Sequence, residues 1–189
     1  MNARADRERL SAQARLLTSV GAPGSVGPRA ARLARRLAGR PETVLAFADV
    51  AAAPDWAAWP VERRAHLADF AAAAACTAVL QRSIDGRRLA RVARRIGEAA
   101  LDAVLASPPG LVPAIPQAED ALADDAAFAA LGAAVLLAEV AGQPAAVGRL
   151  RDLFDVAPPA LDPERGRSAA HVARGLFMAF EAGALEAAA

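Results

Sequence analysis

Arginine is the most concentrated charged residue type in this sequence. Five arginines stand within nine residues: Arg87, Arg88, Arg91, Arg94 and Arg95. If this stretch is helical, Leu89, Val92 and Ile96 form one apolar stripe and the arginines gather on another side. A guanidinium group pairs with a carboxylate through two parallel hydrogen bonds, so such a ridge suits an acidic protein partner. We predict that the five arginines bind a partner; the alternative is an ordinary solvated helix face.

Two tryptophans, Trp56 and Trp59, lie within the proline-bracketed segment PDWAAWP at 54–60. Because they are three positions apart, they share a face if the segment forms a helical turn. Tryptophan is enriched among the residues that contribute most to protein–protein binding, so we include both in the predicted partner surface. The alternative is that they anchor a hydrophobic core.

Residue types that bind metals or carry out catalysis are scattered. His66 and His171 are far apart, and no HxxxH, ExxH or CxxC spacing occurs. Cys76 lies among alanines in the least polar part of the sequence, which is typical of a small core residue and not of a reactive thiol. Phosphate-loop, dinucleotide and nucleophile-elbow motifs are absent from the sequence. We therefore expect no metal, no cofactor and no enzymatic activity.

The segment around Gly97 has one feature of a DNA-binding helix-turn-helix, because Ala93 and Gly97 have the spacing of its first helix and turn. The next helix, EAALDAVLAS at 98–107, would then read the bases. It offers almost no arginine, asparagine, glutamine, serine or threonine to contact base edges. The formal net charge of the chain is only +1, so no strong overall field attracts a polyanion. The sequence therefore argues against nucleic acid as a partner.

Composition predicts an all-α fold. Alanine, leucine, arginine and glutamate dominate, and apolar residues nowhere alternate with polar ones as they do in a strand. We expect one irregular domain of about eight helices, joined by loops that proline marks. The main helices are expected at 60–83, 85–97, 98–107, 119–141 and 164–187, with another from Pro144 to about Asp155.

Capping and breaking residues set the expected helix ends. Asp85 is the predicted N-cap of the arginine-rich helix, and the segment PPGLVPAIP at 108–116 is the sharpest break in the chain. Four acids begin the 119–141 helix, where they complement the helix dipole; we prefer that role to a two-metal carboxylate site. These acids are Glu119, Asp120, Asp124 and Asp125.

We divide the chain into a charged N-terminal arm at 1–40, mobile or ordered by a partner, and a helical core domain at 41–189. The first residues carry both signs of charge, which predicts no signal peptide. The longest apolar runs, at 70–80 and 126–138, are shorter than the roughly 20 residues of a membrane-spanning helix. The single cysteine suits a reducing compartment. We expect a cytoplasmic protein whose membrane contact is only indirect.

The order of features over about residues 60–155 resembles a known family. An alanine- and leucine-rich helix at 67–80 leads through the polar turn at 83–86 into an arginine-rich helix ending in Gly97-Glu98, and an apolar helix follows at 99–106. After the proline-rich break come a helix with a central Gly132, then Pro144 and Arg149-Leu150. This pattern resembles the K component of type III secretion sorting platforms, the SctK/YscK proteins.

The resemblance implies a non-enzymatic adaptor in a bacterial type III secretion apparatus. Such a protein lies at the cytoplasmic face of the inner membrane and links the inner-membrane ring to the cytoplasmic pods. Its partners are other proteins of the secretion complex. This is our first hypothesis for the function.

Two alternatives remain from the sequence. One is a helical ligand-sensing or regulatory domain, which needs an apolar cavity. The residues expected to line that cavity are Phe70, Phe128, Leu136, Phe177 and Phe180. The other alternative is a nucleic-acid-binding protein, for which the arginine-rich helix would supply the phosphate contacts.

Overall fold

A computed structural model of the chain describes residues 53–142 and 149–188. The predicted arm at 1–40 lies outside these residues. The described residues fall into two compact units, 53–59 with 142 and 149–155, and 60–141 with 156–188. Their regular structure consists of seven α-helices and two 3₁₀ helices, without strands, which confirms the all-α prediction. None of the described helices is long and apolar enough to cross a membrane.

The predicted long helix from Pro60 is present but broken once. Helix α4 spans Val61–Ala75, and α5 spans Thr77–Leu80. Between them, the hydroxyl of Thr77 donates a hydrogen bond of 2.7 Å to the carbonyl oxygen of Ala74. A threonine that bonds back to the preceding turn competes with the helical hydrogen-bond ladder, which accounts for the irregularity at Cys76.

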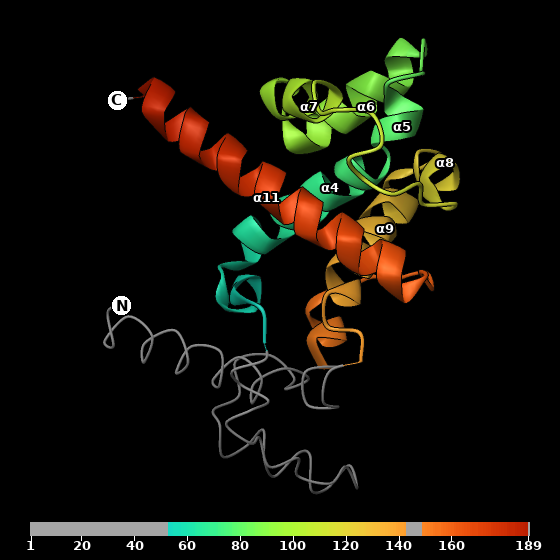
Figure 1. Cartoon of the computed structure of the whole chain (residues 1–189), viewed down its shortest axis with the longest axis vertical. Coiled ribbons are helices and arrows are strands. Elements are labelled where there is room, and N and C mark those ends of the chain that lie inside the picture. The colour runs from blue at the N-terminus through green and yellow to red at the C-terminus, as the bar shows by residue number, and fades with distance from the viewer. Residues whose placement is uncertain (1–52, 143–148, 189) are drawn as a thin grey trace, which may run out of the picture. The chain divides into compact units, whose positions relative to one another are not determined.

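The centre of the larger unit is the contact of α4 with α9, which spans Asp125–Ala138 (Figure 1). The two backbones approach closely because small residues face each other. A Cβ added to Gly132 would lie 2.1 Å from the carbonyl oxygen of Ala68, so only glycine fits there. Five alanines at 71–75 are buried on the α4 side.

Helix α11, Pro163–Ala188, crosses both α4 and α9, as Figure 1 shows. Its Phe177 is completely buried and meets Phe70 edge to face, with the ring centroids 5.6 Å apart. An ion pair from Arg63 of α4 to Glu181, with a nitrogen–oxygen distance of 2.6 Å, joins the same two helices nearer the solvent. The bounds of α11 agree with the helix predicted at 164–187.

The predicted helix at 119–141 is wrong as one element. The structure has a short helix α8, Ala118–Ala121, and then α9, with Leu122 and Ala123 outside both. The physical reason is a second cap. The Asp124 carboxylate accepts a hydrogen bond of 2.7 Å from the backbone N–H of Ala127, so it starts a new helix instead of lying inside a longer one.

The arginine-rich segment folds as predicted. Helix α6 spans Gly86–Ile96, and the Asp85 carboxylate accepts hydrogen bonds from the backbone N–H groups of Arg87 and Arg88. Gly97, at φ 89°, ends α6, and α7 follows at Glu98–Leu105. A positive φ of this size is a conformation that glycine adopts easily, which explains the residue at this junction. The predicted break at 108–116 contains no helix.

The smaller unit is described by two 3₁₀ helices, η1 at Asp55–Ala58 and η2 at Arg149–Leu153. Trp56 of η1 is completely buried, and its ring centroid lies 6.1 Å from that of Phe154. The helix predicted from Pro144 begins outside the described residues, and its described end is the 3₁₀ helix η2.

Candidate protein-binding site on helix α6

Helix α6 presents one apolar side and one cationic side. Val92 and Ile96 are buried and Leu89 is half-buried, as the spacing predicts. The five arginines occupy the remaining surface in two states of exposure: Arg87 and Arg94 are exposed, whereas Arg88, Arg91 and Arg95 are half-buried. The structure therefore separates residues that the sequence grouped together.

Arg95 is committed to the core of the larger unit. Its Nε and Nη2 atoms donate hydrogen bonds of 3.0 and 2.6 Å to one carboxylate oxygen of Asp69 on α4. Its Nη1 atom donates to the carbonyl oxygen of Asp125 at 3.3 Å, and the guanidinium carbon lies 5.5 Å from the ring centroid of Phe128. These contacts satisfy most of its donors and place the cation against an aromatic ring.

Arg91 is committed to the break between α8 and α9. Its Nη1 atom donates hydrogen bonds to the carbonyl oxygens of Leu122 at 2.8 Å and Ala123 at 2.6 Å. A helix end leaves carbonyl groups without intrahelical partners, and a nearby cation satisfies them. The guanidinium groups of Arg91 and Arg95 therefore have partners inside the fold, and the role of these two residues in partner binding stays a prediction.

The side chains of the other three arginines have no hydrogen bond or ion pair to any residue in the described parts of the chain. We call Arg87, Arg88 and Arg94 the unpaired arginines. Their backbone positions are held by α6, which Arg91 and Arg95 attach to the α8–α9 break and to α4. The unpaired arginines are thus long cationic side chains on a helix whose placement is fixed.

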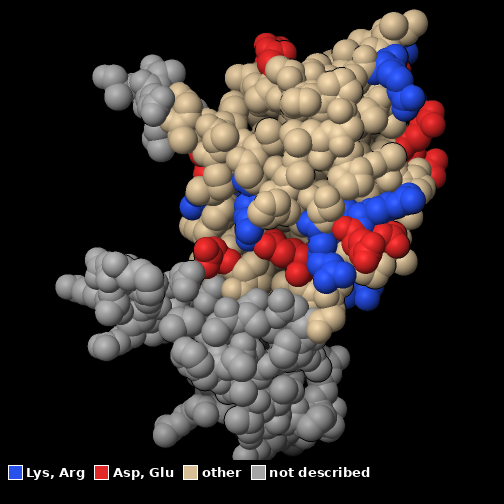
Figure 2. Space-filling model, viewed as in Figure 1, with Lys and Arg blue, Asp and Glu red and all other residues tan. Residues whose placement is uncertain are grey.

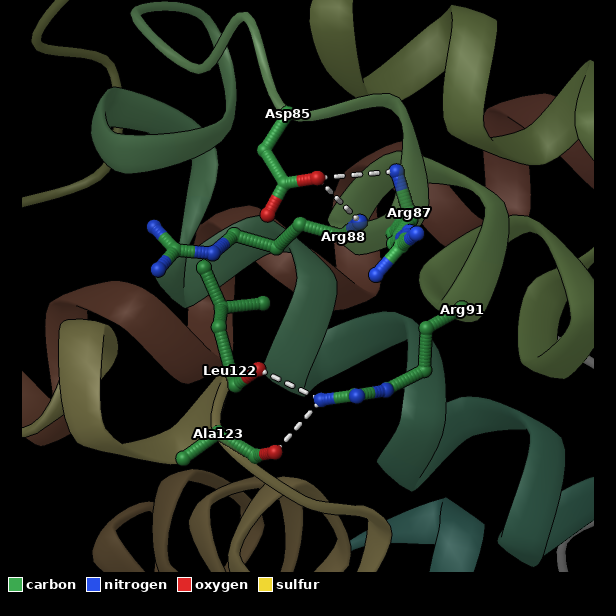
Figure 3. A pocket seen from close by; sticks show the side chains of 6 residues that line it. All are labelled: Asp85, Arg87, Arg88, Arg91, Leu122 and Ala123. Carbon is green, nitrogen blue, oxygen red and sulfur yellow. Dashed lines mark hydrogen bonds between the residues drawn. The ribbon is translucent and has the colours of Figure 1, made fainter.

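A pocket of about 230 Å³ lies between the start of α6 and the α8–α9 break. Figure 3 shows the side chains of Arg87, Arg88 and Arg91 around one space, with Leu122 closing a side and Asp85 beside the first turn of the helix. The six lining residues are Asp85, Arg87, Arg88, Arg91, Leu122 and Ala123. The composition of this lining suits a small anionic group.

The predicted tryptophan pair divides between burial and partial exposure. Trp56 is completely buried, in agreement with the alternative that it anchors a core, and Trp59 is only half-buried. Sequence spacing alone could not distinguish these outcomes. Neither tryptophan lines the pocket at the start of α6.

The Cys76 thiol lies in a setting that makes it unreactive. The Cys76 thiol is completely buried and donates to the carbonyl oxygen of Ala118 at 3.3 Å, and burial raises its pKa to about 12. A thiol with this pKa is almost entirely protonated at neutral pH, and the thiolate is the nucleophilic form. Among the described residues, no three histidine, cysteine, aspartate or glutamate side chains form a cluster able to hold a metal ion.

His66 of α4 contacts two other helices. Its Nε2 atom lies 3.4 Å from the carbonyl oxygen of Ile96, and its ring meets that of Phe177 edge to face at 5.4 Å. Asp69, three residues later, pairs with Arg95 instead. The histidine therefore packs against α6 and α11 from its position on α4.

Three of the five apolar residues assigned to a ligand cavity, Phe70, Phe177 and Phe180, have their rings close to one another. The Phe70 ring is 5.6 Å from that of Phe177 and 6.2 Å from that of Phe180. Phe128 and Leu136 of α9 are buried as well. Rings at these distances are in contact, so Phe70 of α4 packs against both phenylalanines of α11.

The geometry around Gly97 also bears on DNA binding. One residue joins α6 to α7, whereas a helix-turn-helix has a turn of three or four residues. The exposed side of α7 carries Glu98 and Asp102, and these negative charges repel phosphate. Among the described residues on the face shown in Figure 2, positive and negative side chains are interspersed.

The sequence contains signals for two features that the predictions did not include. Asp124 precedes an apolar run, which is the pattern of an N-cap, and it could have located the α8–α9 break. Ile84 lies in a polar turn and has a relative exposure of 102 %, so it projects fully into solvent beside the pocket residue Asp85. The carbonyl groups that bind Arg91 carry no signal in the sequence.

Comparison with known proteins adds no relative. No protein-family model, no curated protein and no solved structure matches this chain.

Proposed function

We propose that this chain is a non-enzymatic adaptor that binds an acidic surface of another protein through the unpaired arginines of α6. The observation that supports this most is that the side chains of Arg87, Arg88 and Arg94 lack partners in the described residues while Arg91 and Arg95 anchor the same helix. A guanidinium group on an anchored helix loses less freedom when it binds a carboxylate than one on a flexible segment does.

We further propose that the adaptor works in a bacterial type III secretion apparatus, where it links the inner-membrane ring to the cytoplasmic pods. This finer statement depends on the resemblance of residues 60–155 to the SctK/YscK proteins. It assigns the protein to the cytoplasmic face of the inner membrane through its protein partners.

The test uses the full chain and the ring and pod proteins encoded in the same genome. The variant R87E/R88E/R94E reverses the three unpaired arginines, and the matched control R151E/R165E/R167E reverses three other exposed arginines. We expect the first variant to keep its helical circular dichroism spectrum and to lose affinity for one partner by at least about tenfold, since several charged contacts become repulsive. The control should stay within about twofold of the wild type.

Two results would contradict the proposal. Equal loss of binding in both triple variants would mean that only overall charge matters, and the unpaired arginines would not be a specific surface. Normal export of secretion substrates by a strain lacking the gene would remove the role in secretion while leaving open an adaptor role elsewhere.

A further inference from the structure

The pocket at the start of α6 combines cationic side chains with a limited volume. It holds about 230 Å³ between Arg87, Arg88 and Arg91, which is enough for one small group such as a carboxylate with its methylene stem. The backbone N–H groups of the first helical turn are not its donors, because Asp85 already accepts from two of them. Any ligand would therefore be recognised by guanidinium groups.

Two of the three guanidinium groups make no hydrogen bond or ion pair with a described residue. The side chains of Arg87 and Arg88 have no partner among the described residues, and Arg91 directs only Nη1 to the carbonyl oxygens of Leu122 and Ala123. The three cations and the one carboxylate of Asp85 leave a net charge of +2 in the lining. A bound anion would offset this charge and gain charge-assisted hydrogen bonds.

The surroundings favour an anion of low charge. Asp120 and Asp124 are exposed and stand within two residues of the lining positions Leu122 and Ala123, and Glu119 and Asp125 are their neighbours in the chain. Negative charges close to the lining positions in the sequence reduce the positive potential of this region. They repel a phosphate group, which carries up to two charges, more strongly than they repel one carboxylate group.

Beside the pocket stands one fully exposed apolar side chain. Ile84 has a relative exposure of 102 % and directly precedes Asp85. A single exposed apolar residue is ordinary on a protein surface. This one directly precedes a residue that lines a cationic pocket, so a bound partner can contact it. Because it is one residue from a lining position, Ile84 can offer an apolar contact to the same short partner segment that the guanidinium groups bind.

We infer that this pocket binds the carboxylate of a glutamate or aspartate side chain in an acidic protein segment, with Ile84 contacting an apolar residue of that segment. This inference rests on the proposed adaptor function and names the chemistry of the partner. Arg88 is the central residue, because its guanidinium group extends across the pocket beside Leu122 (Figure 3).

The experiment titrates the ¹⁵N-labelled full chain with three probes and follows the NMR signals of the backbone and of the arginine Nε–H groups. The probes are the peptide Ac-Leu-Glu-Glu-Leu-NH₂, its neutral counterpart Ac-Leu-Gln-Gln-Leu-NH₂, and inorganic phosphate. We expect saturable shifts at residues 84–91 with the glutamate peptide, and affinity about tenfold lower for the glutamine peptide and for phosphate.

Variants assign the effect to the pocket. Arg88→Gln should lower the affinity for the glutamate peptide by about tenfold, and Arg165→Gln, an exposed arginine on α11, should leave it unchanged. Ile84→Ser should weaken binding by about threefold, because it removes one apolar contact. Val61→Ser, at another exposed apolar residue, is its control. All four positions are at least partly exposed, so the variants should fold.

Several outcomes would overturn the inference. Equal binding of the two peptides would exclude carboxylate recognition, and phosphate binding as tight as that of the glutamate peptide would make the pocket a general anion site. Normal peptide binding by Arg88→Gln would show that the peptide binds outside this pocket. If the peptide fails to bind but R87E/R88E/R94E still loses its cognate partner, the pocket inference fails and the adaptor proposal stands. If the peptide binds and no secretion protein does, the pocket inference stands and the adaptor proposal fails.

Discussion

Helices α4 and α6 are attached to the rest of the larger unit by opposite means. Helix α4 meets α9 through alanine and glycine, with the carbonyl group of Ala68 facing the space that a side chain at position 132 would occupy. Besides its buried apolar side, helix α6 is attached through long cations, as Arg91 and Arg95 reach backbone carbonyl groups and the carboxylate of Asp69. The α4–α9 contact depends on the absence of side-chain atoms at Gly132. The polar attachment of α6 depends on the length of the arginine side chain.

The difference explains where a partner surface can exist. A contact made by small residues brings two backbones together and excludes water. Side chains at such a contact are buried and cannot bind a partner. A contact made by arginines uses only part of the helix circumference. On α6 the anchoring residues Arg91 and Arg95 lie among the unpaired arginines, so one helix both attaches to the core and presents charge.

The largest expected effect breaks the close contact of α4 with α9. Replacing Gly132 by alanine puts a methyl group 2.1 Å from the Ala68 carbonyl oxygen, so the two backbones must separate. We expect the free energy of unfolding in urea to fall by about 3 kcal/mol. Gly175→Ala is the control, because an added Cβ on this exposed α11 residue meets nothing within 4 Å. Alanine should stabilise that position by about 0.5–1 kcal/mol, and equal losses at both positions would refute the contact.

An intermediate effect concerns the buried thiol between α4 and α5. Burial raises the pKa of Cys76 from 9.0 to about 12, so the unfolded chain loses this proton at lower pH than the folded chain does. The stability contribution is therefore complete below pH 9 and falls as the pH rises toward 12, by about 2–3 kcal/mol at pH 11.

This pH dependence is easy to isolate, because the sequence contains no lysine and no tyrosine that would titrate in the same range. Urea denaturation at pH 8 and pH 11 gives the measurement. The variant Cys76→Ala should remove the difference between the two pH values. If the wild-type protein is equally stable at pH 8 and pH 11, then water solvates the thiol in the folded state and burial does not raise its pKa.

The smallest effect sharpens the description of α6. The side chains of Arg95 and Asp69 are 26 % and 17 % exposed, so their ion pair is partly shielded from water. A double-mutant cycle with Arg95→Ala and Asp69→Ala should give a coupling of about 1 kcal/mol. Arg94→Ala, at the adjacent unpaired arginine, should change stability by less than about 0.5 kcal/mol. A coupling near zero would mean that the Arg95–Asp69 ion pair does not help to hold α6 in place.

Much of the local structure could be predicted from residue types. Asp85 caps α6, Gly97 ends it and the prolines at 108–116 keep that segment non-helical, since each effect acts within a few residues. The split of the helix predicted at 119–141 was missed, although Asp124 was its signal. A single cap inside an otherwise helical pattern competes with strong alanine propensity, and local reasoning does not decide which prevails.

The candidate site was predicted only in part. The sequence by itself determined that α6 has an apolar and a cationic side, because a helix repeats every 3.6 residues and its side chains follow. Only the tertiary structure decided that Arg91 and Arg95 turn inward and that Arg87, Arg88 and Arg94 remain unpaired among the described residues. The reason is physical: a guanidinium group goes to whichever acceptor lies within reach. The acceptors at Asp69, Leu122 and Ala123 come within reach only when α4 and the α8–α9 break pack against α6.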